Sequence, residues 1–162
     1  MHMKKLLILG AGGFGQMVKE TAHLMGYSKV VFLDDVIKGE EVIGRCCDYV
    51  ISHAEYPVAV AAFGNNKTRL FWTDKLLKEG YDVPAIVHPS AVVSPSAMLE
   101  PGCFVMQKAV VNTNTKVERA ALVNSGAIVD HNSIVGAGAH IGLGSVVKAN
   151  CIIETGKKVE AG

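Results

Sequence analysis

The hydrophobic positions of residues 87–159 repeat with a period of six. From Val87 to Val159, every sixth residue is valine, isoleucine or leucine, at thirteen consecutive positions. A second series, four residues after each of these, is small at eleven of its twelve positions. This period is typical of the hexapeptide parallel β-helix, in which short strands are joined by tight corners. We expect the aliphatic residue to fill the interior and the small residue to lie where the wall bends.

Three hexapeptides make one triangular coil of 18 residues, so residues 87–158 predict four coils without an interrupting loop. A series of β-hairpins would instead alternate apolar and polar residues, with turn signals about every 8–12 residues. Neither feature is found in this part of the sequence. The pattern therefore favours the β-helix.

The first half of the chain has a different pattern. Apolar runs at residues 4–9, 30–33 and 58–63 predict strands, and residues 15–25 and 68–79 have the spacing of helices. This alternation is typical of a parallel sheet of three or four strands. Nine of the ten aromatic residues precede residue 85, so the composition changes where the pattern changes. We expect a Rossmann-like α/β domain at residues 1–84 and an all-β domain, the β-helix, at residues 85–162.

Composition and charge narrow the function classes. Apolar residues make up 49% of the chain and charged residues 19%, which is enough for a packed core. A formal charge of +1 argues against a nucleic-acid-binding protein. No apolar run reaches the roughly 18 residues of a membrane span, so we expect no membrane insertion. Four cysteines without CxxC spacing predict reduced thiols and a cytoplasmic protein. We assign no functional role to His2.

Residues 10–15 form the glycine-rich segment GAGGFG, which follows a predicted strand and opens a predicted helix. In that context glycines let the backbone approach a phosphate, and the helix N-terminus supplies N–H donors. Asp34 and Asp35 end the next strand, where a carboxylate can bond a ribose hydroxyl. A structural glycine turn and a solvated strand end remain the alternatives. The domain has room for one mononucleotide-binding half, which favours a single nucleotide bearing a sugar over NAD.

Two histidines of the predicted β-helix, His131 and His140, lie nine residues apart and outside the interior register. We expect both to face outward or to lie at a corner. An imidazole there is a candidate general base at neutral pH, and a surface histidine without function is the alternative. Asp130 is the nearest carboxylate to His131, but neighbours along a strand point to opposite faces, so we expect it to point away.

The order of these features resembles the bacterial sugar O- and N-acetyltransferases of the sialic acid and bacillosamine type. The resemblance rests on residues 10–15, 32–35, 63–66, 88–91 and 129–131, together with His140. It implies a left-handed β-helix, a nucleotide-sugar-binding first domain, acetyl-CoA as acyl donor, no metal and a homotrimer. The sugar substrate would be a nucleotide-activated amino sugar or a sialic-acid-type sugar.

The resemblance also implies roles for individual residues. His131 would be the general base at a subunit interface, and His140 would contact acetyl-CoA. Apart from the resemblance, acyl transfer needs donors for the developing oxyanion, and we expect backbone N–H groups around Gly142 to supply them. The positions that match the family's nucleotide-sugar contacts are Gly12, Gly13, Phe14, Asp34, Asp35 and Gly64.

The sequence departs from the family pattern at three places. Phe14 stands where the family often has histidine, and Asn132 stands where some members have a glutamate that orients the base. The chain also ends at Gly162 in mid-repeat, which predicts a truncated form. The first hypothesis is therefore an acetyltransferase. A catalytically silent nucleotide-sugar-binding or scaffold module is the second, and an NAD-linked oxidoreductase half-domain, disfavoured by the single nucleotide-binding half, is the third.

Overall fold

The computed structural model of the protein describes residues 3–162, and His2 lies outside this range. The chain divides into two compact units, Met1–Pro84 and Ala85–Gly162. The division falls where the aromatic residues give way to the six-residue repeat. Each unit has its own sheet architecture and its own core.

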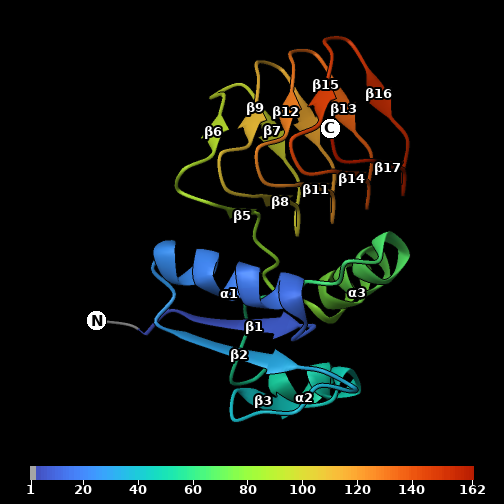
Figure 1. The fold of residues 1–162 in the computed structure, drawn as a ribbon. Helices are drawn as coiled ribbons and strands as arrows, with labels where there is room; N and C mark the ends of the chain where they lie inside the picture. The colour runs from blue at the N-terminus through green and yellow to red at the C-terminus, as the bar shows by residue number, and fades with distance from the viewer. Residues whose placement is uncertain (1–2) are drawn as a thin grey trace. The chain divides into compact units, whose positions relative to one another are not determined.

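The first unit is built on a four-stranded parallel sheet with the order β3-β2-β1-β4. Its strands are β1 (Lys5–Leu9), β2 (Lys29–Leu33), β3 (Val42–Gly44) and β4 (Ala59–Ala61). Helix α1 (Gly13–Leu24) connects β1 to β2 and packs against both strands, and helix α3 (Asn66–Glu79) follows β4 and packs against it (Figure 1). The predicted alternation of strands and helices is confirmed, because each apolar run becomes a buried strand.

Three short elements of the first unit were not predicted: β3, the 3-10 helix η1 (Cys46–Asp48) and helix α2 (Tyr49–Ser52). Each spans only three or four residues, too few for a hydrophobic period to develop. The predicted boundaries also move. Helix α1 begins at Gly13 after the N-cap Gly12, and α3 begins at Asn66, where the side chain of Asn65 accepts the N–H of Thr68 at 2.9 Å.

The second unit consists of short parallel strands, thirteen of them within residues 85–162. They are β5 (Ile86–Val87), β6 (Val92–Val93), β7 (Met98–Leu99), β8 (Phe104–Val105), β9 (Val110–Val111), β10 (Lys116–Val117), β11 (Leu122–Val123), β12 (Ile128–Val129), β13 (Ile134–Val135), β14 (His140–Ile141), β15 (Val146–Val147), β16 (Ile152–Ile153) and β17 (Lys158–Val159). Paired residues are 18 apart in the sequence, as Val105 and Val123 are. The predicted coil length is therefore confirmed.

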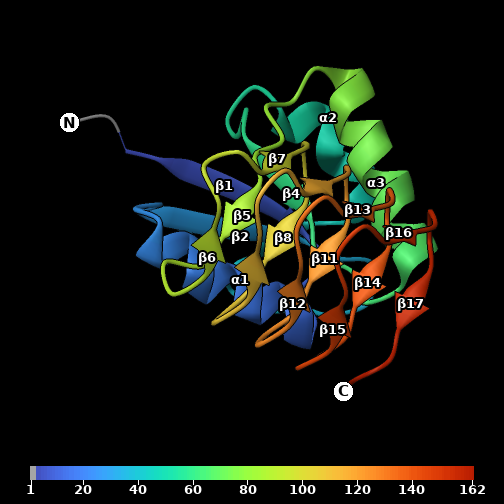
Figure 2. The ribbon, with the colours of Figure 1, turned by 90° about the horizontal axis from the view of Figure 1, so that it is seen from above.

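Successive strands fall in turn on three walls. The first wall is β5-β8-β11-β14-β17, the second β6-β9-β12-β15 and the third β7-β10-β13-β16. Figure 2 shows the strands of each wall in rows. The aliphatic series predicted to fill the interior forms one cluster of buried and partly buried residues, which includes Val117 and Val129. Apolar members of the small series, such as Ala121 and Ala127, belong to the same cluster. The repeat thus forms the parallel β-helix that the six-residue period predicts.

Asparagines support one corner of the β-helix, the corner between the second and third walls. Asn114, Asn132 and Asn150 stand one above another there, with positive φ angles of 56°, 56° and 59°. Asparagine tolerates this left-handed conformation better than most residues with a side chain. Their amides form a ladder, since Asn114 Nδ2 donates to Asn132 Oδ1 and Asn132 Nδ2 donates to Asn150 Oδ1, both at 3.3 Å. The side chain of Asn132 is therefore engaged along the corner.

Candidate functional site

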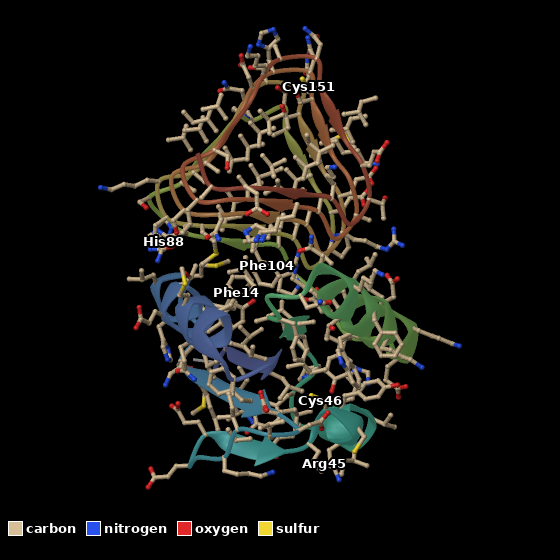
Figure 3. All side chains as sticks on the ribbon, turned by 45° about the vertical axis from the view of Figure 1, so that its right-hand side comes forward. Phe14, Arg45, Cys46, His88, Phe104 and Cys151 are labelled. Carbon is tan, nitrogen blue, oxygen red and sulfur yellow. The ribbon has the colours of Figure 1, made fainter. Side chains whose placement is uncertain are left out.

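His131 lies at this same corner, just after β12 has ended at Val129. Cys151, labelled in Figure 3, marks the corner one coil further on, where its N–H donates to Ser133 Oγ at 3.2 Å. The side chain of His131 is 51% exposed. As the interior register predicts, this imidazole is no part of the core.

The carboxylate of Asp130 holds the imidazole of His131. Its Oδ1 accepts the backbone N–H of His131 at 2.7 Å and lies 3.0 Å from Nδ1 of the same residue. The amide Nδ2 of Asn112, one coil earlier, donates to the same oxygen at 3.0 Å. The expectation that Asp130 points away from His131 is wrong, because the strand ends at Val129 and its alternation does not extend into the corner.

These contacts decide where the imidazole proton lies. The backbone N–H of His131, its ring and the amide of Asn112 hold the pKa of Asp130 below its usual value. Asp130 is therefore a carboxylate at neutral pH and can only accept, so Nδ1 of His131 carries the hydrogen and donates. Nε2 is then the nitrogen with the lone pair. A ring held in this way can take a proton at Nε2, and the adjacent anion stabilises the imidazolium.

His140 is the first residue of β14, on the first wall. The amide Nδ2 of Asn124 lies 3.1 Å from His140 Nε2, and Asn124 Oδ1 accepts the N–H of Ser125 at 2.8 Å. The second bond fixes which way the amide faces, so Nδ2 of Asn124 is the donor toward His140 Nε2. Asn124 was not singled out in the sequence, because the position directly after the interior aliphatic residue is commonly polar, as at Asn112 and Asp130.

A small cavity of about 130 Å³ surrounds His140. Its lining residues are Asn124, His140, Gly142, Leu143, Lys158, Glu160 and Ala161. The N–H of Gly142 does not face this space as a donor, because it bonds to the carbonyl of Val159 on the next coil at 2.8 Å. The N–H of Gly142 is therefore engaged between coils, and the expectation of an oxyanion donor among the groups around it stays a prediction.

The two imidazoles lie at different places on the prism. His131 occupies the corner between the second and third walls, His140 lies on the first wall, and strand β13 of the third wall separates them along the chain. A single chain therefore presents two separate imidazole sites rather than one pocket containing both.

In the first unit, the glycines of residues 10–15 divide into two kinds. Gly10 has a φ of 101°, and a Cβ on Gly15 would lie 1.9 Å from the carbonyl oxygen of Gly10, so the fold itself requires both. A Cβ on Gly12 would meet nothing closer than 3.9 Å, and on Gly13 nothing within 4 Å. Gly64, in the loop after β4, is likewise open. The fold thus leaves space beside the backbone at Gly12, Gly13 and Gly64.

The two aspartates after β2 have different environments. Asp34 is buried, and its two oxygens accept three backbone N–H groups at 2.8 Å each, from Ala11, Val36 and Ile37. Burial acts to raise the pKa of Asp34, but the three bonds outweigh it and hold the pKa below its usual value. Asp35 is half exposed and accepts the N–H of Cys46, which is labelled in Figure 3, at 3.0 Å. Asp34 therefore fixes the glycine loop in place.

A groove of about 350 Å³ lies beside the glycine loop. It is lined by Ala11, Gln16, Phe32, Ile37, Lys38, Gly39, Glu40, Glu41 and Val42. Of the predicted nucleotide-sugar residues, Asp34 reaches it only indirectly, through its bonds to Ala11 and Ile37. Phe14 lies in the first turn of α1 (Figure 3). It is not among the residues that line the groove. The sequence did not single out Gln16 or residues 37–42, because a loop without a motif gives no signal.

Arg69 is a further residue that sequence reasoning missed. It is fully buried, and its guanidinium donates to the carbonyls of Phe63 at 2.9 Å and Gly64 at 3.3 Å, and to Asn66 Oδ1 at 2.9 Å. Burial lowers its pKa to about 10, so it stays charged at neutral pH. An arginine on a helix ordinarily predicts an exposed side chain, but this one anchors the loop that contains Gly64.

Among residues 3–162, no group of three or more His, Cys, Asp or Glu side chains is arranged to hold a metal ion. Over the same residues, none of the helices has both the length and the apolar character needed to cross a membrane.

A Rossmann-like unit followed by a hexapeptide-repeat β-helix with an outward imidazole defines a class, the hexapeptide-repeat acyltransferases. Residues 5–76 match the family model of the PglD N-terminal domain. The acetyltransferase domain of PglB from Neisseria gonorrhoeae, in complex with acetyl coenzyme A, is 30% identical, with 99% of this chain and 90% of that chain covered and a TM-score of 0.85. PerB from Caulobacter crescentus, in complex with CoA and GDP-perosamine, is 28% identical over 99% of this chain and 82% of that chain, with a TM-score of 0.83.

This chain belongs to that family of bacterial sugar acetyltransferases. The resemblance drawn from the sequence is confirmed, and so is the fold class, a Rossmann-like sheet followed by a left-handed β-helix. The protein is accordingly an acyltransferase by family. Its membership favours the first hypothesis over an NAD-linked oxidoreductase.

Proposed function

We propose that the protein transfers the acetyl group of acetyl-CoA to an amino or hydroxyl group of a nucleotide-activated sugar, with His131 as general base. The observation that carries this proposal is the bond between Asp130 Oδ1 and His131 Nδ1 at 3.0 Å on an exposed corner. The ligands of the relatives agree with it, since PglB is described with acetyl coenzyme A and PerB with CoA and GDP-perosamine.

The reaction follows from the geometry at His131. Nε2 accepts the proton of the sugar amine or hydroxyl as its nitrogen or oxygen attacks the thioester carbonyl. A bond from the acceptor atom to the acetyl carbon forms, and the bond from that carbon to sulfur breaks. The proton passes from the imidazolium to the departing thiolate of CoA, so charge and atoms balance. Asp130 stabilises the transient imidazolium.

The first unit would bind the nucleotide sugar. The open backbone at Gly12 and Gly13 stands at the N-terminus of α1, where N–H groups and the helix dipole favour a phosphate. Further proposed contacts are Phe14 in the first turn of α1, Asp35 after β2 and Gly64 after β4. Asp34 is proposed to act mainly by fixing the N–H of Ala11, because three backbone bonds occupy its oxygens.

We propose a homotrimer in which the acetyl-transfer site lies between subunits. The outward residues of the second wall are all aliphatic and in register: Val92, Val110, Ile128 and Val146. Val92 and Val146 are each 62% exposed, and a continuous apolar face of this kind favours association. This wall adjoins the His131 corner. A neighbouring chain packed there would bring His140 of one subunit toward His131 of another, where His140 would contact acetyl-CoA.

The compartment proposed for the enzyme is the cytoplasm. All four cysteines, Cys46, Cys47, Cys103 and Cys151, are free thiols, which suits a reducing compartment.

His131→Ala tests the proposal. We expect turnover to fall by a factor of about 100 or more, because a general base contributes roughly 10²–10⁴-fold. Binding of the nucleotide sugar, measured by calorimetry, should stay unchanged. His88→Ala is the matched control, since it removes an imidazole from another corner of the β-helix. Wild-type turnover in His131→Ala would remove His131 from the mechanism.

The second hypothesis is a silent nucleotide-sugar-binding module, and the same calorimeter separates the two. Titration of the wild-type protein with CoA and with a nucleotide sugar should show binding of both. Binding of the sugar nucleotide alone, with no turnover, would favour the silent module.

A further inference from the structure

Asn112 connects the proposed base to the preceding coil of the β-helix. It follows β9 in the same way that Asp130 follows β12, 18 residues later, and its N–H bonds to the carbonyl of Val129 at 2.9 Å. Its side-chain Nδ2 donates to Asp130 Oδ1 at 3.0 Å. The backbone ladder thus fixes the position from which the amide reaches the carboxylate.

Three donors meet at Oδ1 of Asp130, and Asn112 differs from the other two. The backbone N–H and the ring Nδ1 both come from His131, the residue that Asp130 orients. Asn112 is the donor that comes from another coil, so it holds the carboxylate against the framework of the helix. Without it, rotation of the Asp130 side chain would no longer be limited by a partner outside residues 130 and 131.

We infer that Asn112 is a positioning residue for acetyl transfer: it fixes the Asp130 carboxylate so that His131 keeps its proton on Nδ1 and its lone pair on Nε2. This inference rests on the function proposed above. The inferred chain of contacts runs from Asn112 Nδ2 through Asp130 Oδ1 to His131 Nδ1, each step measuring 3.0 Å.

The residues that stack on Asp130 and His131 in the neighbouring coils include one charged side chain. Lys148 stands one coil beyond Asp130, and Thr113 and Ala149 stand one coil before and after His131. Lys148 is exposed and is the charged residue among these three. It stays the same in every variant below, so a change in titration can be assigned to position 112.

The chain's own repeat supplies the variant. Ser94 occupies the position of Asn112 one coil earlier, so Asn112→Ser is compatible with this corner, but its hydroxyl is too short to reach Asp130. We expect kcat to fall about 10-fold with the KM for the sugar nucleotide unchanged, as expected for a group that acts only on the chemical step. Nitrogen-15 NMR of the imidazole should show a larger population of His131 with the proton on Nε2. Asn112→Gln, which retains an amide donor, should recover part of the rate.

Asn112→Asp provides a second test, in which the direction of the change in the pKa of His131 is predicted. A second carboxylate next to Asp130 favours the imidazolium, so the pKa of His131 measured by NMR should rise by about one unit. The acidic limb of the kcat profile should move to higher pH by the same amount. A carboxylate at position 112 also cannot donate to Asp130, so kcat at the optimum pH should fall as it does in Asn112→Ser. Wild-type kcat at that pH would overturn the inference.

Ser125→Ala is the matched control. It removes another side-chain bond between coils, from Ser125 Oγ to Gln107 Oε1 at 3.0 Å, at the corner between the first and second walls. We expect its kcat and its His131 tautomer to match the wild type. An equal loss of rate in Ser125→Ala and Asn112→Ser would overturn the inference, because the loss would then reflect weaker coil packing.

The two proposals can fail separately. If His131→Ala keeps wild-type turnover, the proposed function fails. If His131→Ala is inactive while Asn112→Ser has the wild-type rate and tautomer population, only the role of Asn112 fails. The NMR measurement needs no turnover, so it tests the contact between Asn112 and the Asp130–His131 pair in either case.

Discussion

The two units of the chain relate sequence to function in opposite ways. In the β-helix, Val105, Val123 and Ile141 perform the same task one coil apart, and each is fully buried in the same cluster. A side chain that departs from this repeat is not needed to form it. His131 and His140 are such departures, which is why candidate catalytic residues are easy to find in the repeat.

In the Rossmann-like unit, by contrast, fold and candidate site share residues. Asp34 lies at the end of a strand where a ligand would bind, yet its oxygens hold the backbone of Ala11, Val36 and Ile37. Gly15 belongs to the same loop as Gly12 and Gly13, but only Gly15 is required by packing. A motif residue in this unit therefore has to be tested for its structural role before a binding role is assigned.

The largest expected effect separates the two kinds of glycine. In Gly15→Ala the new Cβ would lie 1.9 Å from the backbone oxygen of Gly10, so the helix and the loop must move apart. We expect the first unit to lose at least about 4 kcal/mol of stability, measured by thermal unfolding followed by circular dichroism.

Gly13→Ala is the control for this change. Gly13 is the first residue of α1, and a Cβ added there would meet nothing within 4 Å. The stability of this variant should stay the same or rise by up to about 1 kcal/mol, because alanine favours a helix over glycine. Its affinity for a nucleotide sugar should still fall, since the proposed phosphate approach is narrowed. Equal melting temperatures for the two variants would contradict the distinction between structural and open glycines.

The next largest loss of stability is expected at an interior position of the β-helix, in comparison with an outward position. Ile141 is fully buried and Ile152 is 72% exposed. Ile141→Ala should cost about 2–5 kcal/mol in urea unfolding, and Ile152→Ala less than about 0.5 kcal/mol. Similar losses of stability at both positions would contradict the assignment of inward and outward residues in the six-residue repeat.

The sequence predicted the fold well wherever a period could accumulate. Thirteen aliphatic positions in one register leave little freedom for Val87–Val159, and each of them became the second residue of a strand. Strand β3, helix η1 and helix α2 are too short to accumulate a period, and they depend on contacts such as that of Asp35 with the N–H of Cys46. Such contacts between distant residues leave no local pattern.

The candidate site was predictable only in part, for a related reason. His131 and His140 stand out as residue types that the repeat does not use. The contact of Asp130 with His131 was mispredicted, because strand alternation was extended one residue past Val129 into a corner. Asn112 and Asn124 act across coils, and Arg69 is buried although arginine is usually exposed, so their roles follow from three-dimensional neighbours.

A smaller effect with a defined pH dependence is expected at Asp34. Asp34→Asn removes an acceptor for the N–H of Ala11 or of residues 36 and 37, and should cost about 1–3 kcal/mol at pH 7. The folded-state pKa of Asp34 lies below its usual value, so its contribution is complete above about pH 5 and is lost as the pH falls below about 4. Urea unfolding at several pH values should show wild type and variant converging in acid. Asp35→Asn, at an exposed carboxylate, is the control and should cost less.

The smallest effect is expected at the ion pairs on the third wall. Lys116 lies 2.8 Å from Glu100 and 3.3 Å from Glu118, and all three side chains are partly exposed. Each glutamate also accepts a backbone N–H of the coil beyond it, at 3.0 Å, and these bonds do not need the lysine. Lys116→Met should therefore lower the melting temperature by about 2 °C or less, and in 1 M salt the difference should vanish because exposed pairs are screened. A larger loss that persists in salt would mean that the charged wall, as well as the aliphatic interior, holds successive coils together.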